Sequence, residues 1–199
     1  MDFDFSEFAG KALDLKRLKR TGWVLKGVKA PESVADHSFM LSVLAYIYSK
    51  KLGMDTEKCA KMALVHDIGE AFSGDIPDRV RGEERSVPLA KKRKLEADGM
   101  EKMLALLPAA EANEIRGLWE EFCTRKTKEA QLVRDLDKLE MCMQALEYAK
   151  NERNAGARRK FAEFFEDGAL NIRTPNIRKV FEKVHAGFKL IAERNRDDI

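Results

Sequence analysis

Residues 60–71 have the sequence Ala-Lys-Met-Ala-Leu-Val-His-Asp-Ile-Gly-Glu-Ala, in which the pair His66-Asp67 and the carboxylate Glu70 lie among small apolar residues. The apolar spacing is helical, and Asp55 or Thr56 can cap the start of the helix. Residues three or four positions apart share one helix surface, so we expect His66, Asp67 and Glu70 to project from adjacent parts of it. The segment predicts a polar cluster opposite a narrow apolar side formed by Ala60, Ala63, Leu64, Ile68 and Ala71.

A second histidine follows an aspartate at Asp36-His37, so two of the three histidines of the chain adjoin a carboxylate. Ser33, with Asp36 three residues later, is an acidic form of the capping box and predicts that a helix begins here. Gly53 can end this helix. His37 then falls in the second turn of a helix whose buried face is predicted to consist of Phe39, Met40, Val43, Leu44 and Ile47.

Nearly every other periodic segment also has helical spacing, and no stretch of two-residue alternation bounded by turns is convincing. The sequence therefore predicts an all-α fold, a helical bundle without internal repeats. Loops are expected at residues 20–31 and 74–88, which contain glycines and prolines. The remaining helices are predicted at about Ser6–Lys19, Val87–Leu107, Ala109–Phe122, Lys126–Asn151, Ala157–Asp167 and Pro175–Arg194.

The length of 199 residues is enough for one well-filled core, and no Pro/Gly/Ser-rich stretch divides the chain. We predict a single domain over residues 1–199, with its core at about 15–150. The C-terminal helices would complete the bundle or form a dimer interface. Five late phenylalanines are compatible with either role, namely Phe161, Phe164, Phe165, Phe181 and Phe188.

Charged residues make up 36% of the chain while the net charge is only +3, which indicates a mixed, solvated surface. The run Lys91-Lys92-Arg93-Lys94 is interpreted as an exposed helix face, and a nucleic-acid-binding domain based on it is the weakest alternative. Three widely spaced cysteines without a CxxC pair indicate reduced thiols. Since no apolar run approaches membrane-spanning length, we expect a cytoplasmic protein without a membrane or nucleic-acid partner.

Four residues from three stretches offer a ligand set for one divalent cation: His37, His66, Asp67 and Asp137. Asp137 is predicted beside a buried helical stripe of Leu132, Leu136, Leu139, Met143 and Leu146. Two nitrogens and two oxygens suit Mn, Co, Fe, Ni or Zn better than Mg or Ca, and four ligands leave positions open for hydrolytic chemistry. The alternative is a set of ordinary capping histidines and ion-paired carboxylates.

The order of these residues, a histidine, then a His-Asp pair, then a distant aspartate, resembles the HD-domain metal-dependent phosphohydrolases. Further stretches resemble the 5′-deoxynucleotidases among them. These are Arg20 and Trp23, Pro31-Glu32-Ser33-Val34-Ala35-Asp36-His37-Ser38, His66-Asp67-Ile68-Gly69-Glu70 and Gly74-Asp75-Ile76-Pro77. The resemblance extends over roughly residues 15–147, most of the chain.

The resemblance implies that His37, His66, Asp67 and Asp137 bind one divalent metal, which could be Co, Mn, Mg, Zn, Ni or Fe. It implies that Arg20 orients the phosphate, and a guanidinium suits that role because it is always charged and bidentate. Glu70 would position or deprotonate water, and Asp75 is a further candidate catalytic group. The implied substrate pocket consists of Arg20, Trp23, Asp75, Ile76, Pro77 and Asp78.

Two features set this chain apart within the resemblance. Thr21 and Gly22 separate Arg20 from Trp23, whereas one branch of the family has the arginine and tryptophan adjacent, so the preference for deoxy over ribo sugars stays open. The third histidine, His185, lies near Phe181 and Phe188 at helical spacing and is predicted to be structural, which favours one metal over two.

The predicted function is hydrolysis of deoxyribonucleoside 5′-monophosphates to nucleoside and phosphate by a homodimeric enzyme. One alternative is an HD hydrolase of another nucleotide, a triphosphate or a signalling nucleotide. The other is a non-catalytic nucleotide-binding scaffold that keeps the fold.

Overall fold

The computed structural model describes residues 6–77, 87–152 and 155–193, and the chain divides into two compact units, Met1–Ala130 and Gln131–Ile199. The described residues contain no strand, only one isolated antiparallel bridge between Lys19 and Ser33, which confirms the all-α prediction. The first unit contains α1 (Ser6–Ala12), a 3-10 helix η1 (Leu13–Lys16), α2 (Thr21–Leu25), α3 (Val34–Leu52), α4 (Thr56–Val65), α5 (Glu70–Ser73), α6 (Leu89–Leu104) and α7 (Ala109–Thr124). The second contains most of α8 (Lys128–Lys150), followed by α9 (Ala155–Arg159), α10 (Ala162–Asn171) and α11 (Pro175–Glu193).

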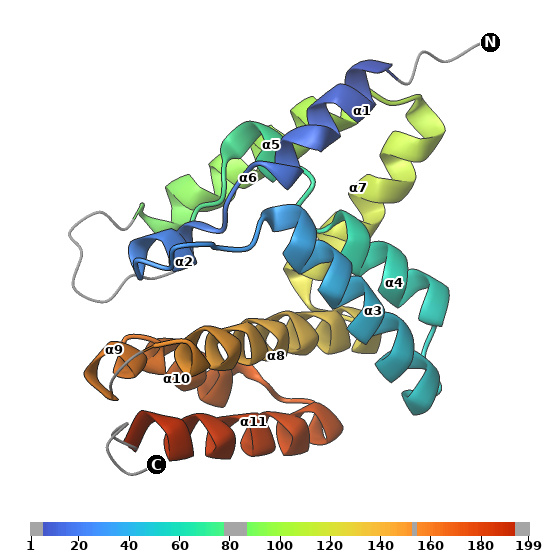
Figure 1. Cartoon of the computed structure of the whole chain (residues 1–199). Helices are drawn as coiled ribbons and strands as arrows, with labels where there is room; N and C mark the ends of the chain where they lie inside the picture. The colour runs from blue at the N-terminus through green and yellow to red at the C-terminus, as the bar shows by residue number, and fades with distance from the viewer. Residues whose placement is uncertain (1–5, 78–86, 153–154, 194–199) are drawn as a thin grey trace. The chain divides into compact units, whose positions relative to one another are not determined.

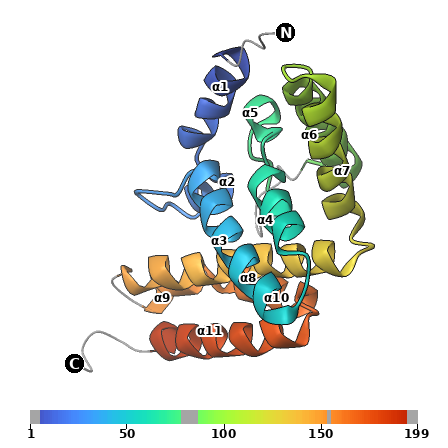
Figure 2. The same cartoon turned by 90° about the vertical axis from the view of Figure 1, so that its right-hand side faces the viewer.

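In the first unit, α3 and α4 lie side by side, α7 packs against α4 and α6, and α5 packs against α6 (Figures 1 and 2). The predicted start of α3 is confirmed, because the Ser33 side chain accepts from the Asp36 N–H and the Asp36 carboxylate accepts from the Ser33 N–H, a complete capping box. Its predicted end is confirmed at Gly53, whose φ of 64° is in the left-handed region. A short connection then leads into α4, which Asp55 caps.

The continuous helix predicted through residues 60–71 is wrong. Helix α4 ends at Val65, and the turn that follows is held by backbone bonds between residues three apart, such as Glu70 N–H to Asp67 O at 3.0 Å. The reason is a close crossing of α5 and α6. A Cβ at Gly69 would lie 2.7 Å from Met100 N, and one at Gly99 would lie 2.6 Å from Gly69 O, so backbones meet where only glycines fit.

The predicted buried face of α3 is only partly right, because Leu44 is buried and Met40 and Val43 are half-buried, whereas the other two residues are exposed. Phe39 is 69% exposed and Ile47 is 52% exposed. The helix is rotated so that a less apolar side is turned inward, and the buried residues are Val34, His37, Ser38, Leu41, Leu44, Ala45 and Ser49. On α4 the predicted side fails likewise at Leu64, which is 57% exposed, while Cys59, Met62 and Ala63 are buried.

The second unit is built on α8, whose Leu132, Leu136 and Leu139 are buried as predicted. Asp135, also on α8, accepts from the N–H groups of Arg173 and Thr174 at 3.0 and 2.6 Å, which fixes the connection before α11. Phe161, Phe165, Phe181 and Phe188 are all buried, and Phe165 stacks on Phe188 with 4.2 Å between ring centroids. Of the two roles left open for the late phenylalanines, this burial favours the core.

The structure corrects two smaller predictions and agrees with a third. The segment 20–31, predicted as a loop, contains the short helix α2, and the single helix predicted at 157–167 is two helices, α9 and α10. The ring of His185 lies 5.3 and 5.4 Å from those of Phe165 and Phe181, the packed arrangement predicted for it. In the described part of the chain, no helix has both the length and the apolar character needed to cross a membrane.

Candidate metal centre

Three of the four predicted ligands meet in the first unit. His37 lies in the second turn of α3, His66 directly follows α4, and Asp67 is the next residue. One ligand atom from each of the three lies within 4.8 Å of the others. The two imidazole rings are 5.5 Å apart between centroids in an edge-to-face arrangement, and both histidines are buried. Such a spacing allows all three side chains to bind a single cation.

The backbone determines which nitrogen of His66 faces the cluster. Nδ1 lies 2.8 Å from the carbonyl oxygen of Ala63. A carbonyl can only accept, so Nδ1 carries the hydrogen and neutral His66 presents the lone pair of Nε2. That Nε2 is 3.0 Å from Asp67 Oδ2, yet it makes no hydrogen bond with any described residue. Two electron-rich atoms at this distance repel each other unless a proton or a metal ion lies between them. The donor set therefore fits a divalent ion.

The pKa values of two carboxyl groups in the cluster, those of Asp67 and Glu70, are shifted in opposite directions. Burial alone would raise the pKa of Asp67, but its close contact with His66 and the guanidinium charge of Arg20 lower it below its usual range, so Asp67 is ionised. Burial raises the pKa of Glu70, and the nearby carboxylates Asp67 and Asp75 raise it further. The Oε2 atom of Glu70 is buried and has no hydrogen-bond partner in the part of the chain that the structure describes. Glu70 is therefore a carboxylate that holds a proton readily beside the ligand cluster.

Arg20 reaches the cluster because the chain pairs with itself just before α3. Val34 N–H donates to Leu18 O at 2.9 Å and Arg20 N–H donates to Glu32 O at 3.0 Å. The Arg20 guanidinium then donates through Nη1 to Asp67 Oδ2 at 3.1 Å and to Asp75 Oδ1 at 3.2 Å. The structure thus brings four predicted site residues, Arg20, Asp67, Glu70 and Asp75, into the neighbourhood of the two histidines.

The other predicted site residues are more dispersed. Trp23 lies in α2, is 1% exposed, and donates through its indole N–H to Glu32 Oε1 at 2.7 Å. Ile76 and Pro77 follow α5 and are half-buried. Asp78 lies outside the described residues. Asp137 lies on α8 in the second unit, and its role as a fourth ligand stays a prediction.

Sequence reasoning missed three residues around the centre. Phe122 packs edge-on against the His66 ring, with 4.9 Å between centroids. Glu32 binds both the Trp23 side chain and the Arg20 main chain. Thr21 binds Asp75 through its N–H and its hydroxyl. Thr21 lies next to Arg20 and Glu32 lies in the stretch quoted for the resemblance, whereas nothing local in the sequence marks Phe122.

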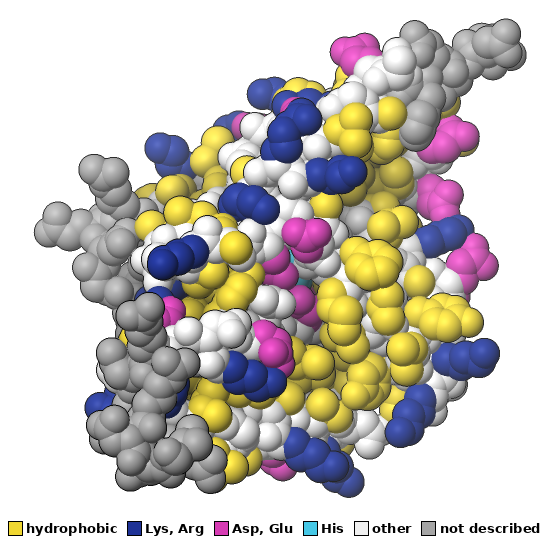
Figure 3. Space-filling view, viewed as in Figure 1, with side chains coloured by type: hydrophobic (Ala, Val, Ile, Leu, Met, Phe, Trp, Pro, Cys, Tyr) yellow, Lys and Arg dark blue, Asp and Glu magenta, His cyan; other side chains and the backbone are white. Residues whose placement is uncertain are grey.

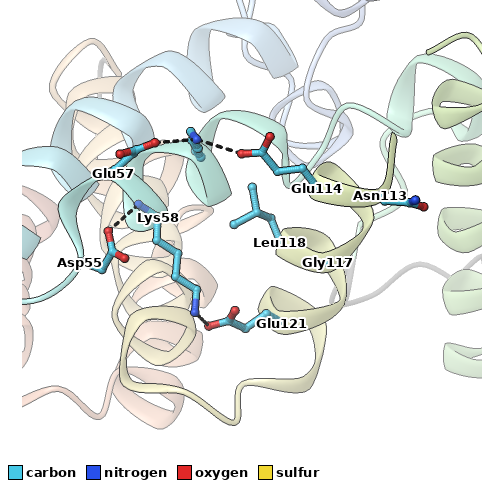
Figure 4. Close-up of a pocket in the computed structure, with 9 residues that line it drawn as sticks. Asp55, Glu57, Lys58, Asn113, Glu114, Gly117, Leu118 and Glu121 are labelled. Carbon is cyan, nitrogen blue, oxygen red and sulfur yellow. Dashed lines mark hydrogen bonds and ion pairs between the residues drawn. The ribbon is translucent and has the colours of Figure 1, made fainter. Parts of the chain in front are cut away.

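A separate hollow of about 530 Å³ lies between α4 and α7 (Figure 4). Its two lysines are held by neighbouring carboxylates: Lys58 Nζ is 2.7 Å from Glu121 Oε1, and Lys61 Nζ is 2.6 Å from Glu57 and 2.8 Å from Glu114. None of the predicted site residues lines this hollow. Because both lysines already form ion pairs, this hollow is a weaker candidate for binding a phosphate than the histidine cluster is.

The helical fold and a histidine-aspartate cluster at a helix end define the class of protein. The chain belongs to the HD domain family, whose sequence pattern matches residues 12–178. It is 41% identical over 151 residues to a zebrafish (Danio rerio) protein named 5′-deoxynucleotidase HDDC2, an alignment that covers 76% of this chain and 71% of that protein. The human protein of the same name is 34% identical over 172 residues, 86% of this chain and 80% of the human one.

Solved structures agree with this family. The crystal structure of the PH0347 protein from Pyrococcus horikoshii has a TM-score of 0.69 and 33% identity, covering 92% of this chain and 98% of that one. A structure described as a predicted metal-dependent phosphohydrolase from Magnetospirillum magnetotacticum has a TM-score of 0.67 at 22% identity, and covers 94% of this chain and 90% of that one. The latter likeness concerns the fold alone.

Proposed function

We propose that this protein is a metal-dependent 5′-deoxynucleotidase, which hydrolyses deoxyribonucleoside 5′-monophosphates to deoxyribonucleoside and phosphate. The observation that carries the proposal is the meeting of His37, His66 and Asp67, with ligand atoms within 4.8 Å of one another, beside the guanidinium of Arg20. Relatives named 5′-deoxynucleotidase, at 32–41% identity, support the substrate class.

His37, His66 and Asp67 would hold the metal, with Asp137 proposed as the fourth ligand. When bound, a divalent cation there supplies Lewis acidity toward a phosphoryl oxygen and toward water. Mn, Co, Fe, Ni and Zn fit the mixed nitrogen and oxygen ligands best, and Mg remains among the ions to be tested.

The chain's own groups would handle the proton and the phosphate charge. Glu70, whose pKa is raised by burial and by the carboxylates of Asp67 and Asp75, would accept a proton from the attacking water. Arg20 would bind the nonbridging phosphoryl oxygens, where charge increases as the ester bond breaks. Asp67 and Asp75 hold Arg20 in this structure at 3.1 and 3.2 Å, so binding of a cation by Asp67 would weaken one of its two ion pairs.

We propose that Trp23, Asp75, Ile76, Pro77 and Asp78 border the nucleoside, and that the two units together form one HD domain. A cytoplasmic location is supported by the thiols, since Cys59, Cys123 and Cys142 form no disulfide. We expect no nucleic-acid or membrane partner.

A homodimer is proposed as well. Hydrophobic side chains gather on the face formed by α3 and α4 (Figure 3). Phe39, Tyr46 and Ile47 of α3 and Leu64 of α4 are all more than half exposed there. An apolar patch of this kind marks a site of protein association in many soluble proteins.

The test is phosphate release from matched deoxy- and ribonucleoside mono- and triphosphates, with Co, Mn, Mg or a chelator. We expect metal-dependent release from deoxyribonucleoside monophosphates. Glu70→Gln should lower kcat by about a hundredfold or more, whereas Glu101→Gln, an exposed carboxylate paired with Arg116, should act as wild type. Release without sugar preference would contradict the nucleoside pocket. Release only from triphosphates would favour another nucleotide as substrate, and binding without any release would favour the scaffold.

A further inference from the structure

Thr21 joins the segment that carries Arg20 to the segment 74–77 that follows α5. Its N–H donates to Oδ2 of Asp75, and its hydroxyl donates to the main-chain carbonyl of Asp75 at 2.7 Å. The two residues are 54 positions apart. One residue therefore holds both the side chain and the backbone of Asp75.

The Asp75 carboxylate is shared between two consecutive donors. Oδ2 accepts from Thr21 N–H and Oδ1 accepts from Nη1 of Arg20 at 3.2 Å. The side chains of Arg20 and Asp75 are only 12% and 8% exposed, so water competes little for these bonds. The carboxylate lies between the two residues and limits where the guanidinium can point.

The backbone before Asp75 is shaped for this contact. Gly74 has a φ of 75°, in the left-handed region that favours glycine. The turn at Gly74 comes directly before the residue whose carbonyl and carboxylate both face Thr21. The left-handed conformation of Gly74 and the two hydrogen bonds from Thr21 to Asp75 together fix the path of the chain after α5.

We propose that Thr21 is a positioning residue of the nucleotide site, which acts through Asp75 to orient the phosphate-binding Arg20. The inference rests on the proposed function for the identity of the substrate. Asp75 is then chiefly the link between Thr21 and Arg20 and not a group that reacts with the substrate. Thr21, the first of the two residues between Arg20 and Trp23, gains a role because it supplies this hydroxyl.

The first test compares kcat/KM for a deoxyribonucleoside monophosphate in three variants. Thr21→Val keeps the shape and removes the hydroxyl, and it should lower kcat/KM about tenfold, the effect expected for one hydrogen bond. Thr21→Ser should restore kcat/KM to within about twofold of wild type. Thr124→Val removes a hydroxyl that donates to the Glu121 carbonyl on the surface of α7, and it should change nothing. Equal activity of Thr21→Val and wild type would overturn the proposal.

A double-mutant cycle separates positioning from a general structural effect. If Thr21 acts through Arg20, Thr21→Val should cost little more in an Arg20→Ala background, whereas independent effects would multiply. Multiplying effects would overturn the proposal even if the single variant were impaired.

Binding of inorganic phosphate, measured by calorimetry on the metal-loaded protein, tests the positioning role of Thr21 independently of the proposed function. A wild type that releases no phosphate from any deoxynucleotide would refute the function. The positioning role would still be supported if Thr21→Val weakened phosphate binding about tenfold and Thr21→Ser did not. Phosphate binding that is absent, or that is equal in wild type and Thr21→Val, would overturn it.

Discussion

His66 and Asp67 are adjacent in the sequence, and their Nε2 and Oδ2 atoms are 3.0 Å apart in the fold. The bond of Nδ1 to the Ala63 carbonyl orients the imidazole so that its lone pair is turned toward the carboxylate. A helix that ended one residue earlier or later would change this orientation. The imidazole of His66 can face Asp67 because His66 follows directly on the last turn of α4, where the Ala63 carbonyl is available to its Nδ1.

Some of the candidate site could be predicted at this scale and some could not. The candidate ligands His37, His66 and Asp67 could be recognised from their residue types and order. The ion pairs of Arg20 with Asp67 and Asp75 join residues 47 and 55 positions apart. Their existence depends on the pairing of residues 18–20 with 32–34, a tertiary contact without a local signal.

The three cysteines should differ in reactivity. Burial raises the pKa of the Cys59 thiol to about 12, and burial also raises the pKa of Cys142, whereas Cys123 is exposed. Because the thiolate is the reactive form, iodoacetamide at pH 8 should modify only Cys123 in the native protein. Peptide mass spectrometry after brief labelling measures this. Early modification of Cys59 or Cys142 under native conditions would contradict the packing around them, and labelling in urea serves as the control.

At the level of elements, the crossing of α5 over α6 places Glu70 beside the ligand cluster. Helix α5 is only four residues long, so its position depends on what it packs against. The contact between Gly69 and Gly99 allows the two backbones to approach closely. Glu70 is the first residue of α5, so this contact also determines where its carboxyl group lies.

Gly99→Ala should disrupt this crossing. The added Cβ would lie 2.6 Å from Gly69 O, so we expect a loss of about 1–3 kcal/mol in the free energy of unfolding and a marked loss of activity. The matched control is Gly117→Ala in α7, where a Cβ meets nothing within 4 Å and should stabilise the helix by about 0.5–1 kcal/mol. Urea unfolding measures both, and a neutral Gly99→Ala would contradict the close crossing.

Most helix ends could be predicted from the sequence because capping is local. Ser33, Asp36 and Gly53 defined α3 almost to the residue, since their side chains or φ angles satisfy backbone groups nearby. The break after Val65 could not be predicted in the same way, because its cause is the contact of Gly69 with α6. The buried face of α3 could not be predicted from size and apolarity, because the buried side includes the polar residue His37, a candidate ligand.

At the scale of the whole molecule, the rotation of α3 also determines which of its apolar side chains lie on the surface. Turning His37 inward leaves Phe39, Tyr46 and Ile47 on the outside. These apolar side chains are exposed to water unless a second chain covers them. Phe39 and Ile47, whose exposure contradicts the predicted buried face, therefore support the proposed dimer.

Sedimentation equilibrium should show a particle of twice the mass of one chain. Ile47→Glu, which places a charge in the apolar patch, should shift the equilibrium toward the monomer. Leu170→Glu on α10, where the leucine is 73% exposed outside this patch, should leave the dimer intact. A wild type that remains monomeric at tens of micromolar, or a dimer that tolerates Ile47→Glu, would contradict this interface.

The most direct test of the candidate metal centre is the number of cobalt ions bound per chain, determined by calorimetry and elemental analysis. Wild type should bind one ion, and Asp67→Ala should bind none while its circular dichroism remains helical. Asp98→Ala, which removes an exposed carboxylate of α6 paired with Lys94, should bind one ion as wild type does. An Asp67→Ala protein that keeps a full complement of cobalt would contradict the assignment of His37, His66 and Asp67 as a metal centre.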